Sequence, residues 1–223
     1  REYILTPDKI MDIVMYKRII DEIILLDVPS IKLNWRGEPL LNSKIGEFIK
    51  YAKSAGILEI SINTNATQLD NKMSELLIVS GLDNIIYSFD GGTKKTYEKM
   101  RPGRFKYNKF EDVYENIKNF NKLKQKMNAK FPVTKIQMVL TEETRGEIES
   151  FYNLFNDIVD DVTVIQYNER GGEISSLKDA NQKQIKKFLK TNEKSEDTPF
   201  MVTADDDIYI SKSRKPCEQL FQR

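Results

Sequence analysis

Hydrophobic and polar residues follow two different periods along the chain, and segments of the two kinds alternate. Apolar residues three or four positions apart predict amphipathic helices at residues 12–27, 43–56, 71–81, 109–127 and 146–160. Short runs rich in β-branched and aromatic residues predict strands at 30–35, 58–65, 84–92, 133–140 and 162–167. Residues 92–100 are expected to form additional helical turns.

The ends of the predicted helices carry recognisable signals. Asp12 is a plausible N-cap for the first helix, and Gly56 and Gly81 close the second and third. The apolar spacing predicts an inward face on the first helix made of Ile13, Tyr16, Ile19, Ile20, Ile23 and Ile24.

Strands that alternate with helices predict an α/β fold with a parallel sheet and right-handed crossovers. A closed eight-stranded barrel typically needs about 250 residues, so we expect a partial, open barrel that lacks its first strand. The chain becomes polar after Gly172. We therefore expect a core at 1–172 and a second part at 173–223, which holds a charged helix and linker, a β-hairpin at 200–213 and the start of an extension.

Composition narrows the chemistry. The 223 residues are 39% hydrophobic and 31% charged with a net charge of +1, which gives no reason to expect nucleic acid or a membrane as partner. The absence of histidine excludes imidazole bases and histidine-bound metals within the chain. The only cysteine, Cys217, excludes an internal disulfide and a complete cysteine cage for a metal cluster, and a cytoplasmic location is expected.

Polar and small residues gather where the predicted strands end. In parallel α/β proteins these ends meet at one rim, where ligands bind. Any one of these segments alone is explained by an ordinary turn, but the set predicts a binding rim. The segments are residues 35–39, 63–65, 88–91, 140–142 and 166–168.

Three of these segments carry a family resemblance. The stretches "WRGEPLLN", "NTNAT" and "SFDGGTKKTYEKMRPGRFKYNKFEDVYENIKNF" resemble radical S-adenosylmethionine (radical SAM) enzymes of the branch with a SPASM or twitch extension. The resemblance covers residues 10–172 and implies a partial (β/α)6-type open TIM barrel. Arg36 replaces the first glycine of the family's GGEP motif, and its role stays open between pointing outward and touching substrate.

The resemblance implies how the cofactor is held. Gly37 lets the backbone approach S-adenosylmethionine (SAM), Glu38 binds its methionyl ammonium, and Pro39 fixes the exit from the strand. The alternative for Glu38 is the solvated face of the next helix. The resemblance further implies that Ser88 and Asp90 contact the ribose and Arg101 the carboxylate. Asn63 and Asn65 are candidates to complete the cofactor or substrate rim, and Gln166 and Tyr167 to border the adenine, with packing roles as the alternative for all four. A turn-forming Asp90 and a surface ion pair of Arg101 are the structural alternatives.

The departures from the family concern cysteine. The C-x-x-x-C-x-x-C motif that binds the catalytic 4Fe–4S cluster is absent. We interpret the chain as starting within the cluster loop, since it lacks an initial methionine; a degenerate, non-catalytic relative is the alternative. Cys217 in "KPCEQLFQR" resembles the first SPASM cysteine and is a candidate ligand of an auxiliary Fe–S cluster, with an incidental thiol as the alternative.

The resulting hypothesis is a radical SAM enzyme that forms a 5′-deoxyadenosyl radical and abstracts hydrogen from a peptide or small-molecule substrate. It implies a reductase or a flavodoxin- or ferredoxin-type electron donor, and it implies that this fragment alone is inactive. Two other classes stay open: a cluster-free module that binds a nucleotide or sugar, and a Schiff-base lyase or aldolase using Lys32 or Lys135, both placed far from the rim.

Overall fold

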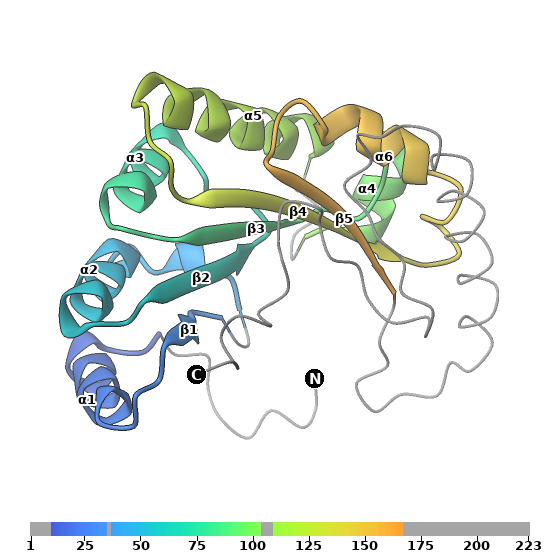
Figure 1. The fold of residues 1–223 in the computed structure, drawn as a ribbon. Helices are drawn as coiled ribbons and strands as arrows, with labels where there is room; N and C mark the ends of the chain where they lie inside the picture. The colour runs from blue at the N-terminus through green and yellow to red at the C-terminus, as the bar shows by residue number, and fades with distance from the viewer. Residues whose placement is uncertain (1–9, 35–36, 104–108, 167–223) are drawn as a thin grey trace, which may run out of the picture. The chain divides into compact units, whose positions relative to one another are not determined.

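The computed structural model describes residues 10–34, 37–103 and 109–166 (Figure 1). The strands form one five-stranded sheet in the order β1-β2-β3-β4-β5, in which β1 and β2, β2 and β3, and β4 and β5 pair in parallel. The predicted α/β class is therefore confirmed. In chain order the elements are α1 (Ile13–Ile24), β1 (Ser30–Lys32), the 3-10 helix η1 (Pro39–Leu41), α2 (Ile45–Ala55), β2 (Glu59–Thr64), α3 (Asn71–Val79), β3 (Asn84–Ser88), α4 (Lys94–Met100), α5 (Phe110–Lys126), β4 (Val133–Leu140), α6 (Ile148–Phe155) and β5 (Asp161–Gln166).

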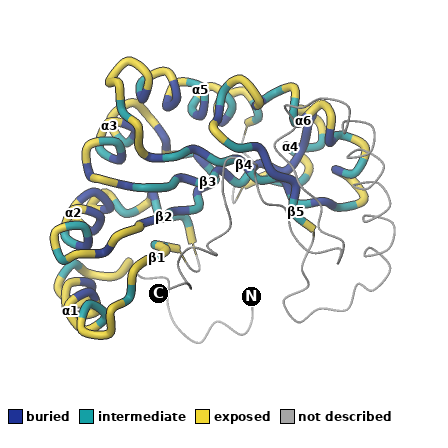
Figure 2. Tube along the Cα trace, in the orientation of Figure 1, coloured by how far each residue is buried: buried dark blue, intermediate teal, exposed yellow. Residues whose placement is uncertain are grey.

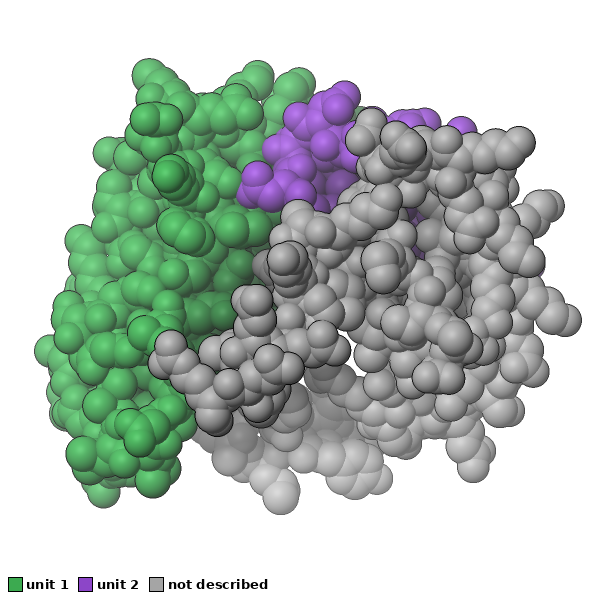
Figure 3. Space-filling model, viewed as in Figure 1, with its two compact units in different colours: residues 1–88, 111–134 green, residues 89–110, 135–223 purple. Residues whose placement is uncertain are grey.

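The chain forms two compact units, shown in Figure 3. Unit 1 comprises residues 1–88 and 111–134, and unit 2 comprises residues 89–110 and 135–223. The predicted division at residue 172 falls outside the described residues and stays a prediction, as do the charged helix and the hairpin.

Unit 1 holds β1, β2 and β3 in register, with Ile31 opposite Ile60 and Ile62 opposite Ile85. Residues of β2 alternate between the two faces of the sheet. On one face, Ile60 and Ile62 are fully buried; Figure 1 shows α2 and α3 on a common side of these strands, and Figure 2 shows buried positions along β2 and β3. The core of this unit therefore lies between the strands and their helices.

The predicted helix signals are present in the structure. The Asp12 carboxylate accepts a hydrogen bond from the Met15 N–H at 2.9 Å and so caps α1. Gly56 follows α2 with φ +109°, and Gly81 lies just beyond α3 with φ +88°, conformations that favour glycine.

Three sequence predictions need correction. The strand predicted at 84–92 ends at Ser88 as β3, since the turn-forming residues Asp90 and Gly91 follow. Ile19 is 38% exposed, because α1 packs mainly against α2 and only a narrow stripe with Tyr16 and Ile20 is buried. The first strand ends at Lys32 instead of residue 35. Its pairing is continued by a side chain, since Asn34 Oδ1 accepts a hydrogen bond from the Asn63 N–H at 3.0 Å.

Unit 2 is built on β4 and β5 and on a cluster of aromatic rings. Phe89 stacks on Tyr97 with ring centroids 4.0 Å apart, and Phe155 meets the edge of Phe89 at 4.9 Å. Phe89, Tyr97 and Phe155 are fully buried. This packing fixes α4 and α6 around the residue that follows β3.

Tyr16 provides a test of the packing in unit 1. Its ring stacks on Phe48 at 4.3 Å, but its buried hydroxyl has no hydrogen-bond partner among the described residues, and burial raises its pKa. We expect Tyr16→Phe to raise the free energy of unfolding by about 1 kcal/mol, because it removes an unsatisfied hydroxyl. Tyr16→Ala, the control, is expected to lower it by about 3 kcal/mol. Urea titration measures both changes. A clear decrease in the free energy of unfolding of Tyr16→Phe would show that the Tyr16 hydroxyl has a hydrogen-bond partner.

Candidate functional site

In unit 1, the Glu38 carboxylate joins the segment after β1 to the end of β2. Oε1 accepts a hydrogen bond from the Thr64 hydroxyl at 2.6 Å and a second from the Leu40 N–H at 3.2 Å. Oε2 accepts one from the Asn65 N–H at 2.8 Å. A carboxylate offers about four acceptor positions. One acceptor position on Oε2 is therefore not used by these three donors.

The two neighbours of Glu38 leave space beside its backbone and fix the path of the chain. Gly37 has φ +154°, and a Cβ built on it would meet no atom within 4 Å. Its backbone is thus accessible from a side that any other residue would cover. Pro39 starts η1, and Glu38 caps that short helix through Leu40.

The turn that follows β2 is held by its own side chains. Asn65 Oδ1 accepts from the Thr67 N–H at 2.9 Å and from the Thr67 hydroxyl at 2.7 Å. Ala66 has φ +58°, and its carbonyl accepts from Asn116 Nδ2 of α5 at 3.0 Å. The Asn65 side chain therefore stabilises the turn and presents its backbone N–H to Glu38.

Two other predicted residues of unit 1 lie on the strands. Asn63 is on β2, and its Oδ1 is buried without a hydrogen-bond partner among the described residues. Ser88 ends β3 and is half-buried. Both side chains belong to the face of the sheet that the helices do not cover, because they alternate with Thr64 and Tyr87.

In unit 2, Asp90 is held by two partners. Its Oδ2 accepts from Arg101 Nε at 2.8 Å and lies 2.7 Å from Arg101 Nη2. Its Oδ1 accepts from the Val139 N–H at 2.7 Å. Asp90 is 8% exposed, so the pair is largely removed from water. Asp90 therefore links the loop after β3 to the end of α4 and to β4.

Glu147 was not singled out from the sequence, although it organises the same loop. Its Oε2 accepts from the N–H groups of Gly92 at 2.8 Å and Thr93 at 3.1 Å. Its Oε1 accepts from the hydroxyls of Thr93 at 2.8 Å and Thr96 at 2.6 Å. These donors lie more than 50 positions from Glu147 in the sequence, so no local sequence pattern predicts the contacts.

The structure gives less information on the remaining predicted residues. Gln166 ends β5 and is exposed, while Arg36, Tyr167 and Cys217 lie outside the described residues. Lys135 Nζ is paired with Asp161 at 2.9 Å, so this candidate for a Schiff-base lysine has a structural role. Within residues 10–34, 37–103 and 109–166, no group of acidic, cysteine or histidine side chains is arranged to hold a metal, and no helix is long and apolar enough to cross a membrane.

The fold and these residues define a parallel α/β protein whose strand ends carry polar, backbone-anchored groups. Residues 1–155 match the radical SAM superfamily, and the chain belongs to that family. The family implies SAM and a 4Fe–4S cluster as cofactors.

Known relatives agree with this assignment. A probable GTP 3′,8-cyclase of Saccharolobus islandicus is 24% identical over 165 residues, which cover 73% of this chain and 50% of that protein. The chain thus spans about half the length of that curated relative.

Solved structures support the fold. The anSMEcpe protein with bound AdoMet gives a TM-score of 0.62 at 20% identity, covering 84% of this chain and 52% of that one. Streptococcus suis SuiB bound to the precursor peptide SuiA gives 0.61 at 16%, covering 84% and 42%. Both show a fold like that of this chain, which resembles the radical SAM partial barrel.

Proposed function

We propose that this chain is the SAM-binding core of an enzyme that abstracts hydrogen from a peptide or small-molecule substrate. The observation that carries the proposal is the Glu38 carboxylate, held by Thr64 and Asn65 next to the open side of Gly37. When bound beside a reduced 4Fe–4S cluster, SAM supplies the 5′-deoxyadenosyl radical that takes the hydrogen atom.

The residues of unit 1 fit the methionyl end of SAM. An ammonium needs anionic or carbonyl acceptors, and Glu38 Oε2 retains one acceptor position after its bond to Asn65. Gly37 lets the backbone come close to the same group. Three internal hydrogen bonds hold the carboxylate in place, so little reorganisation accompanies binding.

Further contacts are assigned by the chemistry of each group. Ser88 offers a hydroxyl for the ribose, and the Arg101 guanidinium suits the SAM carboxylate. Asp90 was predicted to contact the ribose, but its two oxygens already accept hydrogen bonds from Arg101 and Val139, so we propose instead that it orients that guanidinium. As predicted from the sequence, Asn65 would complete the rim and Pro39 would fix the exit from the strand. Gln166 and Tyr167 would border the adenine.

The residues of this chain do not fit the cluster. Three thiolates are needed, whereas the sequence contains one cysteine, Cys217. We propose that the cluster ligands, and the first strand of a (β/α)6-type partial barrel, belong to parts of the full-length protein outside these 223 residues. Cys217 stays a candidate ligand of an auxiliary cluster, in the SPASM manner that the solved neighbours suggest.

The substrate and the electron donor are also proposals. SuiB binds a precursor peptide and anSMEcpe binds the Cp18Cys peptide, whereas the curated relatives are probable GTP 3′,8-cyclases. A peptide and a small molecule are therefore both compatible. A reductase or a flavodoxin- or ferredoxin-type protein would supply the electron.

Reconstitution of the full-length protein tests this function. After anaerobic incubation with iron and sulfide, we expect a brown protein that releases 5′-deoxyadenosine from SAM when dithionite is added. The unreduced sample is the control and should release none. A colourless protein that leaves SAM intact would instead support a cluster-free binding module.

A further inference from the structure

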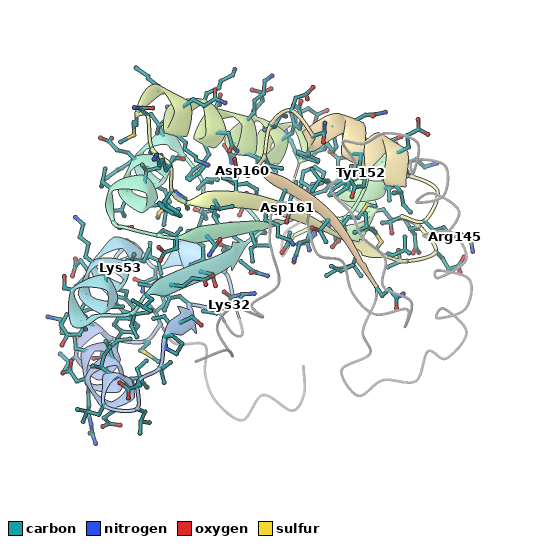
Figure 4. The ribbon with its side chains drawn as sticks, viewed as in Figure 1. Lys32, Lys53, Arg145, Tyr152, Asp160 and Asp161 are labelled. Atoms are coloured by element: carbon teal, nitrogen blue, oxygen red, sulfur yellow. The ribbon has the colours of Figure 1, made fainter. Side chains whose placement is uncertain are left out.

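The face of unit 1 that its helices leave uncovered is polar. The register places Lys32 beside Ser61 and Asn84, and Asn63 beside Ile86. Figure 4 shows Lys32 on the side of β1 away from the helices, whereas Lys53 comes from α2. The interior of a packed barrel is dominated by bulky branched residues such as valine, isoleucine and leucine. This face therefore borders something polar.

Asn63, on this face, has a buried side-chain oxygen that lacks a hydrogen-bond partner among the described residues. Its N–H donates to Asn34 Oδ1 at 3.0 Å, so its backbone is satisfied and its position along the strand is fixed. Its Oδ1 is buried and receives no hydrogen bond from any described residue. Buried acceptors in native structures nearly always have a partner, because leaving one unpaired is costly. A ligand with a hydrogen-bond donor would satisfy this oxygen.

The chemistry of the face favours one class of ligand. A carboxamide pairs well with another amide, since each has a donor and an acceptor. Nucleobases are usually bound by stacking on aromatic rings. The described residues of the uncovered face of β1, β2 and β3 include no aromatic side chain; they are Ser30, Lys32, Glu59, Ser61, Asn63, Asn84, Ile86 and Ser88.

From these observations we infer that Asn63 determines specificity by binding a backbone amide of a peptide substrate through Oδ1, and that it does not bind SAM. The inference rests on the proposed radical SAM function and names the substrate class of the same site. It separates the role of Asn63 from that of Glu38, whose carboxylate accepts hydrogen bonds from the N–H groups of Leu40 and Asn65.

Saturation-transfer NMR on the full-length, SAM-loaded protein tests the inference, with a capped tri-alanine peptide and GTP as probes. We expect transfer to the peptide, reduced about five-fold or more in Asn63→Leu, as loss of one neutral hydrogen bond implies. Asn119→Leu, the same change at an exposed position of α5, should leave transfer unchanged. SAM affinity should stay within about two-fold in all three proteins, a difference of less than half a kcal/mol.

Several outcomes overturn the inference. Equal peptide transfer in Asn63→Leu, transfer to GTP but not to the peptide, or no transfer to either probe would each contradict it. Weaker SAM binding in Asn63→Leu would make Asn63 a cofactor residue. A lower midpoint of thermal unfolding in that variant would show a structural role, whereas removal of an unpaired buried acceptor should keep or raise the midpoint. Failure of the wild type to bind SAM would refute the proposed function itself. The measurement of SAM affinity shows this outcome independently of transfer to the peptide or to GTP.

Discussion

Glu38→Gln in the full-length protein is expected to weaken SAM binding about 10- to 150-fold, the equivalent of one charged hydrogen bond of about 1.5–3 kcal/mol. The amide keeps the shape of the side chain but loses the charge that attracts the methionyl ammonium. It also offers one oxygen where the carboxylate accepts from Thr64, Leu40 and Asn65 through two. Isothermal titration calorimetry with SAM under anaerobic conditions measures the change.

The control for this prediction is Glu47→Gln. Glu47 is exposed in the first turn of α2, so the same chemical change there should leave SAM affinity unaltered. Circular dichroism establishes that both variants are folded. If folded Glu38→Gln binds SAM as tightly as the wild type, the carboxylate does not contact the cofactor and serves only to anchor the strand ends.

Asp90→Ala is expected to lower the free energy of unfolding by about 3 kcal/mol, because it leaves a partly buried guanidinium without its carboxylate. The Arg101 and Asp90 side chains are 25% and 12% exposed, so water compensates little. The Val139 N–H loses its acceptor as well. Urea unfolding of Asp90→Ala, Arg101→Leu and the double variant gives the coupling between the two residues.

An exposed pair provides the comparison. Arg145 and Glu142 lie 2.8 Å apart, but their side chains are 40% and 46% exposed. Glu142→Ala is expected to leave stability nearly unchanged, because solvent and salt screen exposed ion pairs. Equal effects of Asp90→Ala and Glu142→Ala would show that burial does not strengthen the Asp90 contact.

Local signals explain what the sequence predicted well. Asp12 and Gly56 mark helix ends through capping chemistry that involves neighbouring residues only, and the structure confirms both. Every described strand overlaps its predicted range, because each combines β-branched residues with a clear boundary.

The parts that the sequence did not predict depend on distant partners. Asn34 continues the pairing of β1 with β2 through a side chain, which a pattern of β-branched residues does not reveal. Glu147 reaches the loop of Gly92 and Thr93 only once the chain has folded. Thr64 lies between two predicted site residues, yet its bond to Glu38 depends on the twist and register of β1 and β2. The prediction that Ile19 is buried was wrong for a similar reason, since its burial depends on which neighbours cover α1.

The most direct test of the account is an anaerobic crystal structure of the full-length protein with SAM and its cluster. The account predicts the methionyl nitrogen within about 3 Å of Glu38 Oε2, the length of a charge-assisted hydrogen bond. It also predicts that Ser88, in the same unit as Glu38, contacts the ribose of that molecule. SAM bound elsewhere, or bound with its ammonium far from Glu38, would contradict the central claim.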